Sequence, residues 1–167
     1  MKKIKFLYSY QIDPIKWDAC VQNSVNKKIY ACSWYLDIIS KNWAGLIYGD
    51  YELVFPIIFK KWWFLKKIYH PFFCQQLGPY AVDKKLLHNK ALLLSIIDFL
   101  NTKYRTFEFS INHVCSKSII QVISKTHGIQ SVERVNLELS LDNSYEKLRS
   151  NYSTNHRRNL TKKINNF

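Results

Sequence analysis

A basic segment near the end of the sequence carries the side chains best suited to binding an anionic ligand. If the segment is helical, Arg158 and Lys162 lie four residues apart on one face, whereas Arg157 is rotated from Arg158 by about 100°. Such a helix could bind the phosphates of an RNA or of a lipid-linked precursor. The alternative is a solvated linker helix that packs against another domain. The candidate binding residues of the segment are His156, Arg157, Arg158, Lys162 and Lys163.

The cysteines, histidines and glutamates do not form a recognisable catalytic pattern. The four cysteines are far apart, without C-x-x-C spacing or a nearby histidine, so we expect buried reduced thiols and no metal site. His70, which precedes Pro71, is interpreted as structural because no Ser/Cys-His-Asp set has informative spacing. Glu52 and Glu108 could activate an amine through water, although a strand glutamate on a solvated face is the commoner case. No residue is therefore predicted to be catalytic.

Composition indicates a folded basic domain. Hydrophobic residues make up 47% of the 167 residues, enough for a packed core. The formal net charge of +13 favours an anionic partner such as nucleic acid, phosphate or a membrane surface, and an AT-rich coding bias is an equally good explanation. No apolar run approaches the roughly 18 residues needed to span a bilayer, and no signal-peptide cleavage site follows the first strand. We therefore expect a cytoplasmic protein without a transmembrane segment.

The first half of the chain is predicted to hold one strand, two helices and three further strands. Asp13 before Pro14 is typical of a helix start, and Ser33 is predicted to cap a second helix. Gly49-Asp50 is typical of a hairpin turn, and Pro56 favours an edge position or a bulge. We expect strand 3–10, helices 14–24 and 34–41, and strands 44–48, 51–59 and within 67–77.

The second half is predicted to alternate helices with strands. Asp83 is expected to cap a long helix to residue 103, and Ser144 to cap a helix in the basic tail. Between them we expect strand 105–111, helix 116–127 and strand 132–141. The order β-α-α-β-β-β-α-β-α-β predicts an α/β (α+β) domain at 1–142, followed by a basic helical linker at 143–167. This order resembles the GNAT (acyl-CoA N-acyltransferase) fold, a mixed central sheet with helices on both faces.

Several segments are similar to the N-terminal half of Fem-type and FemAB-like acyltransferases, which carry two GNAT-like domains in tandem. The most specific is Ser153-x-x-x-Arg157-Arg158-x-Leu160-x-Lys162, a form that in this family leads from the first domain into the second. The other matching segments are Ile29-Tyr30-Ala31, Ser33-Trp34-Tyr35-Leu36-Asp37, Gly49-Asp50-Tyr51-Glu52, Phe55-Pro56, Tyr69-His70-Pro71, Gln75-Gln76-Leu77-Gly78 and Asn151-Tyr152-Ser153.

The resemblance also points to a turn where GNAT enzymes bind the pyrophosphate of acyl-CoA, with the form Gln/Arg-x-x-Gly-x-Gly/Ala. Gln76, Gly78 and Tyr80 occupy this turn and are the second set of candidate binding residues. However, Tyr80 stands where Gly or Ala is expected, Pro79 has no N–H, and Asp83 adds a negative charge. A structural turn is the preferred interpretation, so no cofactor is assigned to this chain, although acyl-CoA or aminoacyl-tRNA is possible for the full-length family.

The resemblance implies transfer of an acyl or aminoacyl group to an amine by a protein of which this chain is the non-catalytic N-terminal domain. Because the sequence stops at Phe167, where a second domain would begin, the expected partner is that GNAT-like domain or a homodimer mate, together with an anionic ligand. One alternative is a binding module for RNA or an anionic membrane, acting through the basic tail and the apolar tip at 62–65. Another is a solitary GNAT acetyltransferase.

Overall fold

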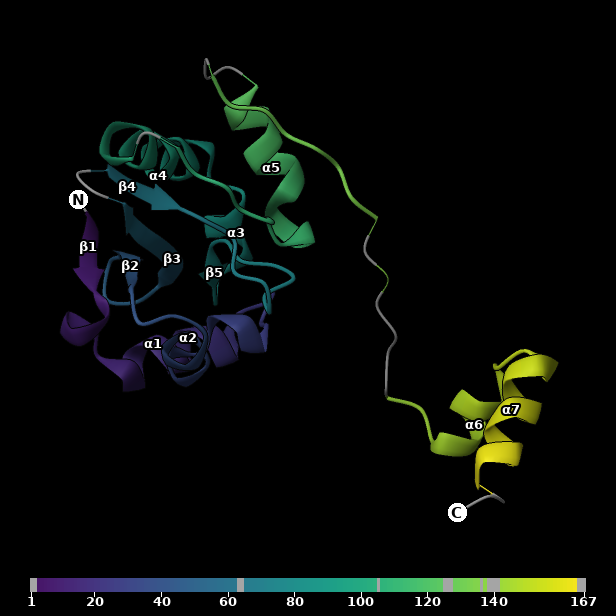
Figure 1. The fold of residues 1–167 in the computed structure, drawn as a ribbon. Coiled ribbons are helices and arrows are strands. Elements are labelled where there is room, and N and C mark those ends of the chain that lie inside the picture. Colours follow the sequence, from purple (N-terminus) through teal and green to yellow (C-terminus); the bar gives the residue numbers. More distant parts are fainter. Residues whose placement is uncertain are drawn as a thin grey trace. The chain divides into compact units, whose positions relative to one another are not determined.

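The computed structural model of the chain divides into two compact units, Met1–Ser131 (unit 1) and Val132–Phe167 (unit 2). It describes residues 3–62, 65–104, 106–124, 128–135, 137 and 142–164. The protein is a mixed α/β protein built on a small antiparallel sheet (Figure 1). Within the described residues, no helix is both long and apolar enough to cross a membrane.

Five strands form the sheet of unit 1, in the order β1-β2-β3-β4, and β5 pairs with β3 beside β4. Every pairing between these strands is antiparallel, whereas the sequence predicts a mixed sheet. The strands are β1 Ile4–Tyr8, β2 Trp43–Tyr48, β3 Leu53–Trp62, β4 Leu65–Ile68 and β5 Tyr80–Ala81.

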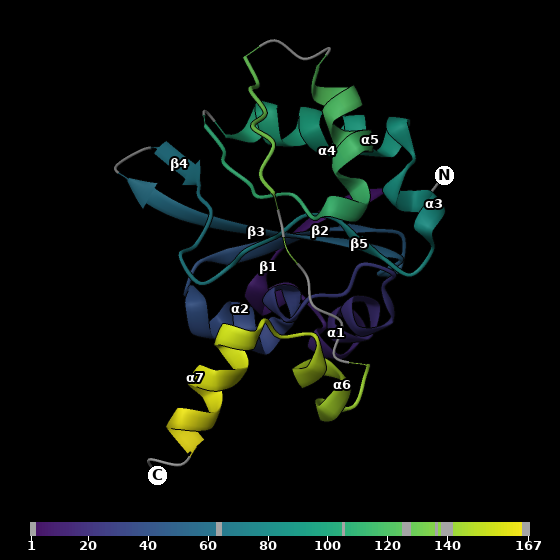
Figure 2. The same cartoon turned by 90° about the vertical axis from the view of Figure 1, so that its right-hand side faces the viewer.

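Helices cover both faces of the sheet, as predicted. Alternate residues of β2 and β3 face opposite sides, so that Leu46 and Phe55 belong to one buried cluster and Ile47 and Val54 to another. Figure 2 shows α1 and α2 on one side of the strands and α4 and α5 on the other. The helices of unit 1 are α1 Pro14–Asn23, α2 Ser33–Ile39, α3 Lys84–Leu87, α4 Lys90–Lys103 and α5 His113–Ile123, with short 3-10 turns at Ser9–Gln11 and Ile29–Ala31.

The predicted start of α1 is confirmed and that of α2 is corrected. The Asp13 carboxylate accepts hydrogen bonds from the backbone N–H groups of Ile15 and Lys16, which satisfies two otherwise unpaired donors. Ser33 is instead the first residue of α2, with Cys32 at the N-cap position. The Ser33 hydroxyl donates to Asp18 at 2.7 Å, so it connects α2 to α1 rather than capping its own helix.

The hairpins of the sheet explain the predicted turn and the position of Pro56. Gly49 adopts a left-handed φ of 62°, as a tight turn requires, and the second left-handed residue is Tyr51 rather than Asp50. On the side of β3 away from β2, β5 pairs with Leu53 and Val54 and β4 begins pairing at Phe59. Pro56 therefore lies in the gap between the two neighbours, where a residue without an N–H is tolerated.

The two predicted helices of the second half have different limits from those expected. The segment 83–103 is interrupted after Leu87, because Asn89 begins a new helix by accepting from the N–H of Leu92. Asp83 caps the first piece as predicted, through the N–H of Lys85. The next helix, α5, starts before residue 116, since Asn112 is its N-cap, and residues 125–127 of the predicted range lie outside the described residues.

Three predicted strands are corrected. In the range 67–77 only residues 67 and 68 lie in a strand, the end of β4. The segment 105–111 forms only isolated parallel bridges, of Thr106 with Lys67 and of Ile111 with Leu77. Arg105 lies outside the described residues, as do 136 and 138–141 in the range 132–141. The described residues of 132–141 form no strand, and Val135 is 92% exposed. Alternating apolar residues need a neighbouring strand and a core to pack on, and Val135 has neither.

Unit 2 contains the helices α6 Tyr145–Ser150 and α7 Thr154–Ile164. Ser144 caps α6 as predicted, since its hydroxyl accepts from the N–H of Lys147. The guanidinium of Arg149 on α6 donates to the Thr161 hydroxyl on α7 at 3.4 Å, which links the two helices. The basic tail is thus a small helical hairpin.

Candidate functional site

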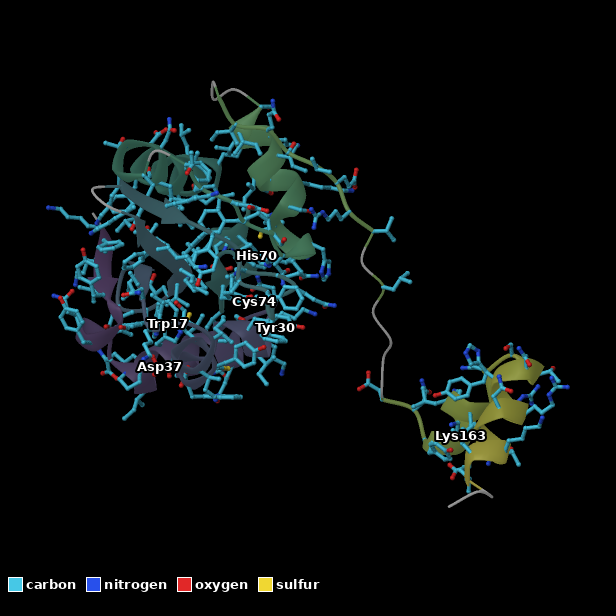
Figure 3. All side chains as sticks on the ribbon, in the orientation of Figure 1. Trp17, Tyr30, Asp37, His70, Cys74 and Lys163 are labelled. Carbon is cyan, nitrogen blue, oxygen red and sulfur yellow. The ribbon has the colours of Figure 1, made fainter. Side chains whose placement is uncertain are left out.

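Helix α7 presents all the candidate residues of the basic segment to solvent. Ser153 precedes the helix and its hydroxyl accepts from the N–H of His156 at 3.3 Å, an N-cap arrangement. Leu160 is the half-buried residue of α7, and its remaining described residues are exposed. The five side chains on this helix are His156, Arg157, Arg158, Lys162 and Lys163; Figure 3 labels the last of them.

The positive charges of α7 have no acidic partner among the described residues. Arg158 donates only to the neutral Asn155 side chain at 3.4 Å, and the His156 ring lies 6.3 Å from the ring of Tyr152. Glu146, an acid on α6, is bonded by its own N–H and by the Ser144 hydroxyl, which lower the pKa of its carboxyl. The helix therefore carries a positive surface that an external anion could neutralise.

The second candidate set lies in the interior of unit 1. Tyr80 belongs to β5, its ring is fully buried, and its hydroxyl donates to the carbonyl oxygen of Gln76 at 3.3 Å. Burial raises the pKa of this hydroxyl well above its usual range. Gly78 has a φ of +143°, which favours glycine. Gln76 is buried as well, so these three residues lie under the surface of unit 1.

Backbone groups of the turn that contains Gln76, Gly78 and Tyr80 are bonded within the fold. The Leu77 N–H donates to the carbonyl of Ser110 at 2.7 Å, and the Leu77 carbonyl accepts from the N–H of Asn112. The Pro79 carbonyl accepts from the Asn26 side chain at 2.8 Å. The Asp83 carboxylate occupies the start of α3, where a phosphate would otherwise lie. The two candidate sets thus belong to different units and have opposite exposure.

A group of buried amides around this turn was not anticipated. Asn112 is fully buried and connects α5 to the segment after α1, because its side-chain N–H donates to the Asn26 carbonyl at 3.3 Å. The side-chain oxygens of Asn26 and Gln76 are buried without a hydrogen-bond partner among the described residues. The sequence holds one indication of the role of Asn112: it directly precedes an apolar helical repeat, and asparagine is a preferred N-cap residue.

His70 and Glu52 have the positions of structural residues. The Nδ1 atom of His70 accepts from the N–H of Ser110 at 3.3 Å, so Nε2 carries the proton that is donated to the Cys74 carbonyl. Figure 3 labels His70 and Cys74 on the same side of unit 1. Glu52 lies in the turn between β2 and β3 rather than in a strand.

The four thiols are expected to resist alkylation in the native protein. All are buried and free, and burial raises the pKa of Cys20 and Cys74 to about 11 and that of Cys115 to about 12. Native protein treated with iodoacetamide near neutral pH should keep its mass, whereas the unfolded chain should gain four adducts. Rapid native modification of any cysteine, located by peptide mass spectrometry, would contradict this expectation.

Comparisons of the chain with family models, with curated proteins and with solved structures found no match.

Proposed function

We propose that this chain is the non-catalytic N-terminal domain of a Fem-type N-acyltransferase with a GNAT-like fold, and that α7 binds phosphate groups of the substrate. Proteins of this class join an acyl or aminoacyl group to an amine. The arrangement of unit 1 supports the proposal: two helices follow the first strand and cover one face, and α4 covers the other face after an antiparallel meander.

One observation carries the proposal: the Ser-x-x-x-Arg-Arg-x-Leu-x-Lys segment forms α7 with its cap, and its three cationic side chains are exposed. Ser153 caps the helix, and Leu160 is half-buried. Arg157, Arg158 and Lys162 are exposed, so their charges are accessible to an external partner. Arginine suits this role because its planar guanidinium donates two parallel hydrogen bonds to a phosphate.

The role of α7 in such a reaction is positional. Activated acyl donors and lipid-linked acceptors carry phosphate groups. A helix that binds the phosphate of one such substrate also orients the reacting atoms at the opposite end of that substrate. No proton transfer is assigned to the described residues, because His70 uses both ring nitrogens in structural bonds and the buried thiols stay protonated. The groups that remove a proton from the amine would belong to the second GNAT-like domain.

Neutralising two charges of α7 is expected to weaken binding to a phosphate polymer. The variant R157Q/R158Q should lower the affinity for a labelled single-stranded RNA about tenfold, and reduce the salt dependence of binding by roughly one counterion per arginine. Fluorescence anisotropy at several salt concentrations measures both quantities. The control K84Q/K85Q removes two exposed cations of α3 in unit 1 and should bind RNA like the parent chain.

Two results would contradict the proposal. An equal loss of RNA affinity in both variants would show that binding reflects net charge rather than α7. Calorimetric titration with acetyl-CoA at low salt tests whether the chain is non-catalytic, and no heat of binding is expected. One-to-one binding in the micromolar range would instead make the chain a solitary acetyltransferase. No heat is expected because the Asp83 carboxylate already accepts from the Lys85 N–H at the start of the helix that follows the turn around Gly78.

A further inference from the structure

A tight turn in unit 1 places two phenylalanines in solvent. The Cys74 N–H donates to the Pro71 carbonyl at 3.1 Å, which makes Phe72 and Phe73 the central residues of the turn. Phe72 is 95% exposed and Phe73 is 71% exposed, and their rings meet edge to face at 5.3 Å. Turn tips normally carry glycine, asparagine, aspartate or serine, so two exposed phenylalanines need an explanation outside the fold.

Side chains from elsewhere in unit 1 bind the backbone of this turn and hold it in place. The Tyr35 hydroxyl on α2 donates to the Phe73 carbonyl at 2.7 Å. The His70 ring donates to the Cys74 carbonyl and accepts from the Ser110 N–H, and the Cys74 side chain is buried. The two rings therefore project from a fixed base, although they contribute little buried area to the stability of unit 1.

Helix α2 extends the apolar surface. Trp34 and Ile38 are four residues apart on its outer face, and they are 50% and 75% exposed. The Trp34 ring contacts that of Tyr35 at 5.7 Å, and Tyr35 reaches the turn through its hydroxyl. These contacts join two segments far apart in sequence into one aromatic surface, made of Trp34, Tyr35, Ile38, Phe72 and Phe73.

Exposed lysines flank the part of the chain that carries α2. Lys27 and Lys41 are exposed, and in the sequence they lie just before and just after the segment that contains the 3-10 turn Ile29–Ala31 and α2. Two acids also lie on or beside α2, and both are bonded within the fold. Asp37 accepts a hydrogen bond from the Trp43 indole at 2.7 Å, and Asp18 accepts from the N–H and the hydroxyl of Ser33. The chain as a whole is basic, with a formal net charge of +13.

We propose that the aromatic surface docks unit 1 on an anionic lipid surface. Two phenylalanines on a protruding turn can enter the boundary between headgroups and acyl chains, while tryptophan and tyrosine suit the headgroup level because each has an apolar ring and a polar tip. Neighbouring lysines are attracted to anionic headgroups. The proposal concerns unit 1 and does not depend on the function assigned to α7.

Vesicle co-sedimentation with the full chain tests the proposal. The probe is a vesicle of phosphatidylglycerol mixed with phosphatidylcholine, and the parent chain should bind it. The variants F72S and F73S should each weaken binding about tenfold, because each removes a ring that is buried only in the lipid. Both should unfold at the same denaturant concentration as the parent, since neither ring is buried in the fold.

A matched control removes two other exposed apolar side chains. Ile15 on α1 is 81% exposed and Val132 is 82% exposed, and I15S/V132S should bind vesicles like the parent. The variant F72S/F73S should also keep the RNA affinity of the parent, which separates this surface from α7. Three results would overturn the proposal: no vesicle binding by the parent, unchanged binding by F72S/F73S, or a parent dimer that F72S/F73S dissociates, which would assign the surface to a second copy.

Discussion

Replacing Gly45 by alanine is expected to destabilise unit 1 by about 3 kcal/mol, because the added methyl group has no space. Gly45 lies in β2 opposite Pro56 of β3. A Cβ atom at this position would be 2.3 Å from Cζ3 and 2.8 Å from Cη2 of Trp17. It would also approach the Ile12 side chain at 3.1 Å. Either the indole moves or the strand separates from α1.

The indole of Trp17 cannot move away at low cost. Its side chain is fully buried, and its Nε1–H donates to the Ala31 carbonyl at 2.7 Å. The ring packs against that of Trp43 with the centroids 5.3 Å apart. A displaced indole would leave the Ala31 carbonyl without this donor and disturb the cluster beneath α1 and α2.

Urea unfolding followed by circular dichroism measures the loss, and a second substitution identifies its cause. Phenylalanine at position 17 lacks the indole carbons that the new methyl group would meet. W17F will itself cost stability, but adding G45A to W17F should cost less than about 1 kcal/mol. An equal cost of G45A in both backgrounds would show that the clash with Trp17 is not the reason.

Capping residues in the sequence predicted the starts of helices better than the alternation of apolar residues predicted strands. Asp13, Asp83 and Ser144 act as N-caps because a carboxylate or hydroxyl binds N–H groups two or three residues ahead, which depends on nearby residues alone. Ser33 has the same short side chain, yet it donates to Asp18 on another helix. Its partner could not be inferred, because that contact depends on how α1 and α2 pack.

Strand predictions failed where alternation had no neighbouring strand. Segment 105–111 alternates as a half-buried strand should, but only Thr106 and Ile111 form bridges there. The alternation in 132–141 predicted burial that Val135 does not have. Periodicity indicates which side of a segment is apolar; it does not indicate whether a partner strand is present.

The two candidate sites differ in how far sequence could predict them. The exposure of α7 follows from its composition, because five cationic or titratable residues leave little to bury. The aromatic surface could not be predicted, since Phe72 and Phe73 occur in the range 67–77, which is rich in strand-forming residues and within which a strand is predicted. Their exposure depends on the turn closed by Cys74 and on the distant hydroxyl of Tyr35.

Replacing Asn112 by aspartate is expected to cost about 3 kcal/mol of stability near pH 7, and less in acid. The Asn112 side-chain oxygen accepts from the Val114 N–H at 3.0 Å, which an aspartate oxygen can also do. In the parent protein, the Nδ2 group of Asn112 donates to the Asn26 carbonyl at 3.3 Å. A carboxylate oxygen there would face another acceptor, as a charge in a fully buried site.

The pH dependence follows from the proton that the new side chain would bind. Burial and the facing carbonyl oxygen should raise the folded pKa of the carboxyl above its unfolded value of about 3.9. The folded state then binds this proton more tightly than the unfolded state. The penalty is absent below the unfolded pKa, grows as pH rises toward the folded pKa, and stays constant above it. In the protonated form, the carboxyl O–H can donate to Asn26.

The comparison with alanine separates charge from lost hydrogen bonds. N112A removes the cap and the bond to Asn26 without adding a charge, so it should cost about 2 kcal/mol at every pH. Urea unfolding of the parent, N112A and N112D near pH 4 and pH 7 gives the differences directly. If the deficit of N112D relative to the parent is the same at both pH values, the carboxyl is not buried as a charge. Its position would then have to be reached by water, and the contact between α5 and the Asn26 segment would be looser than the 3.3 Å hydrogen bond indicates.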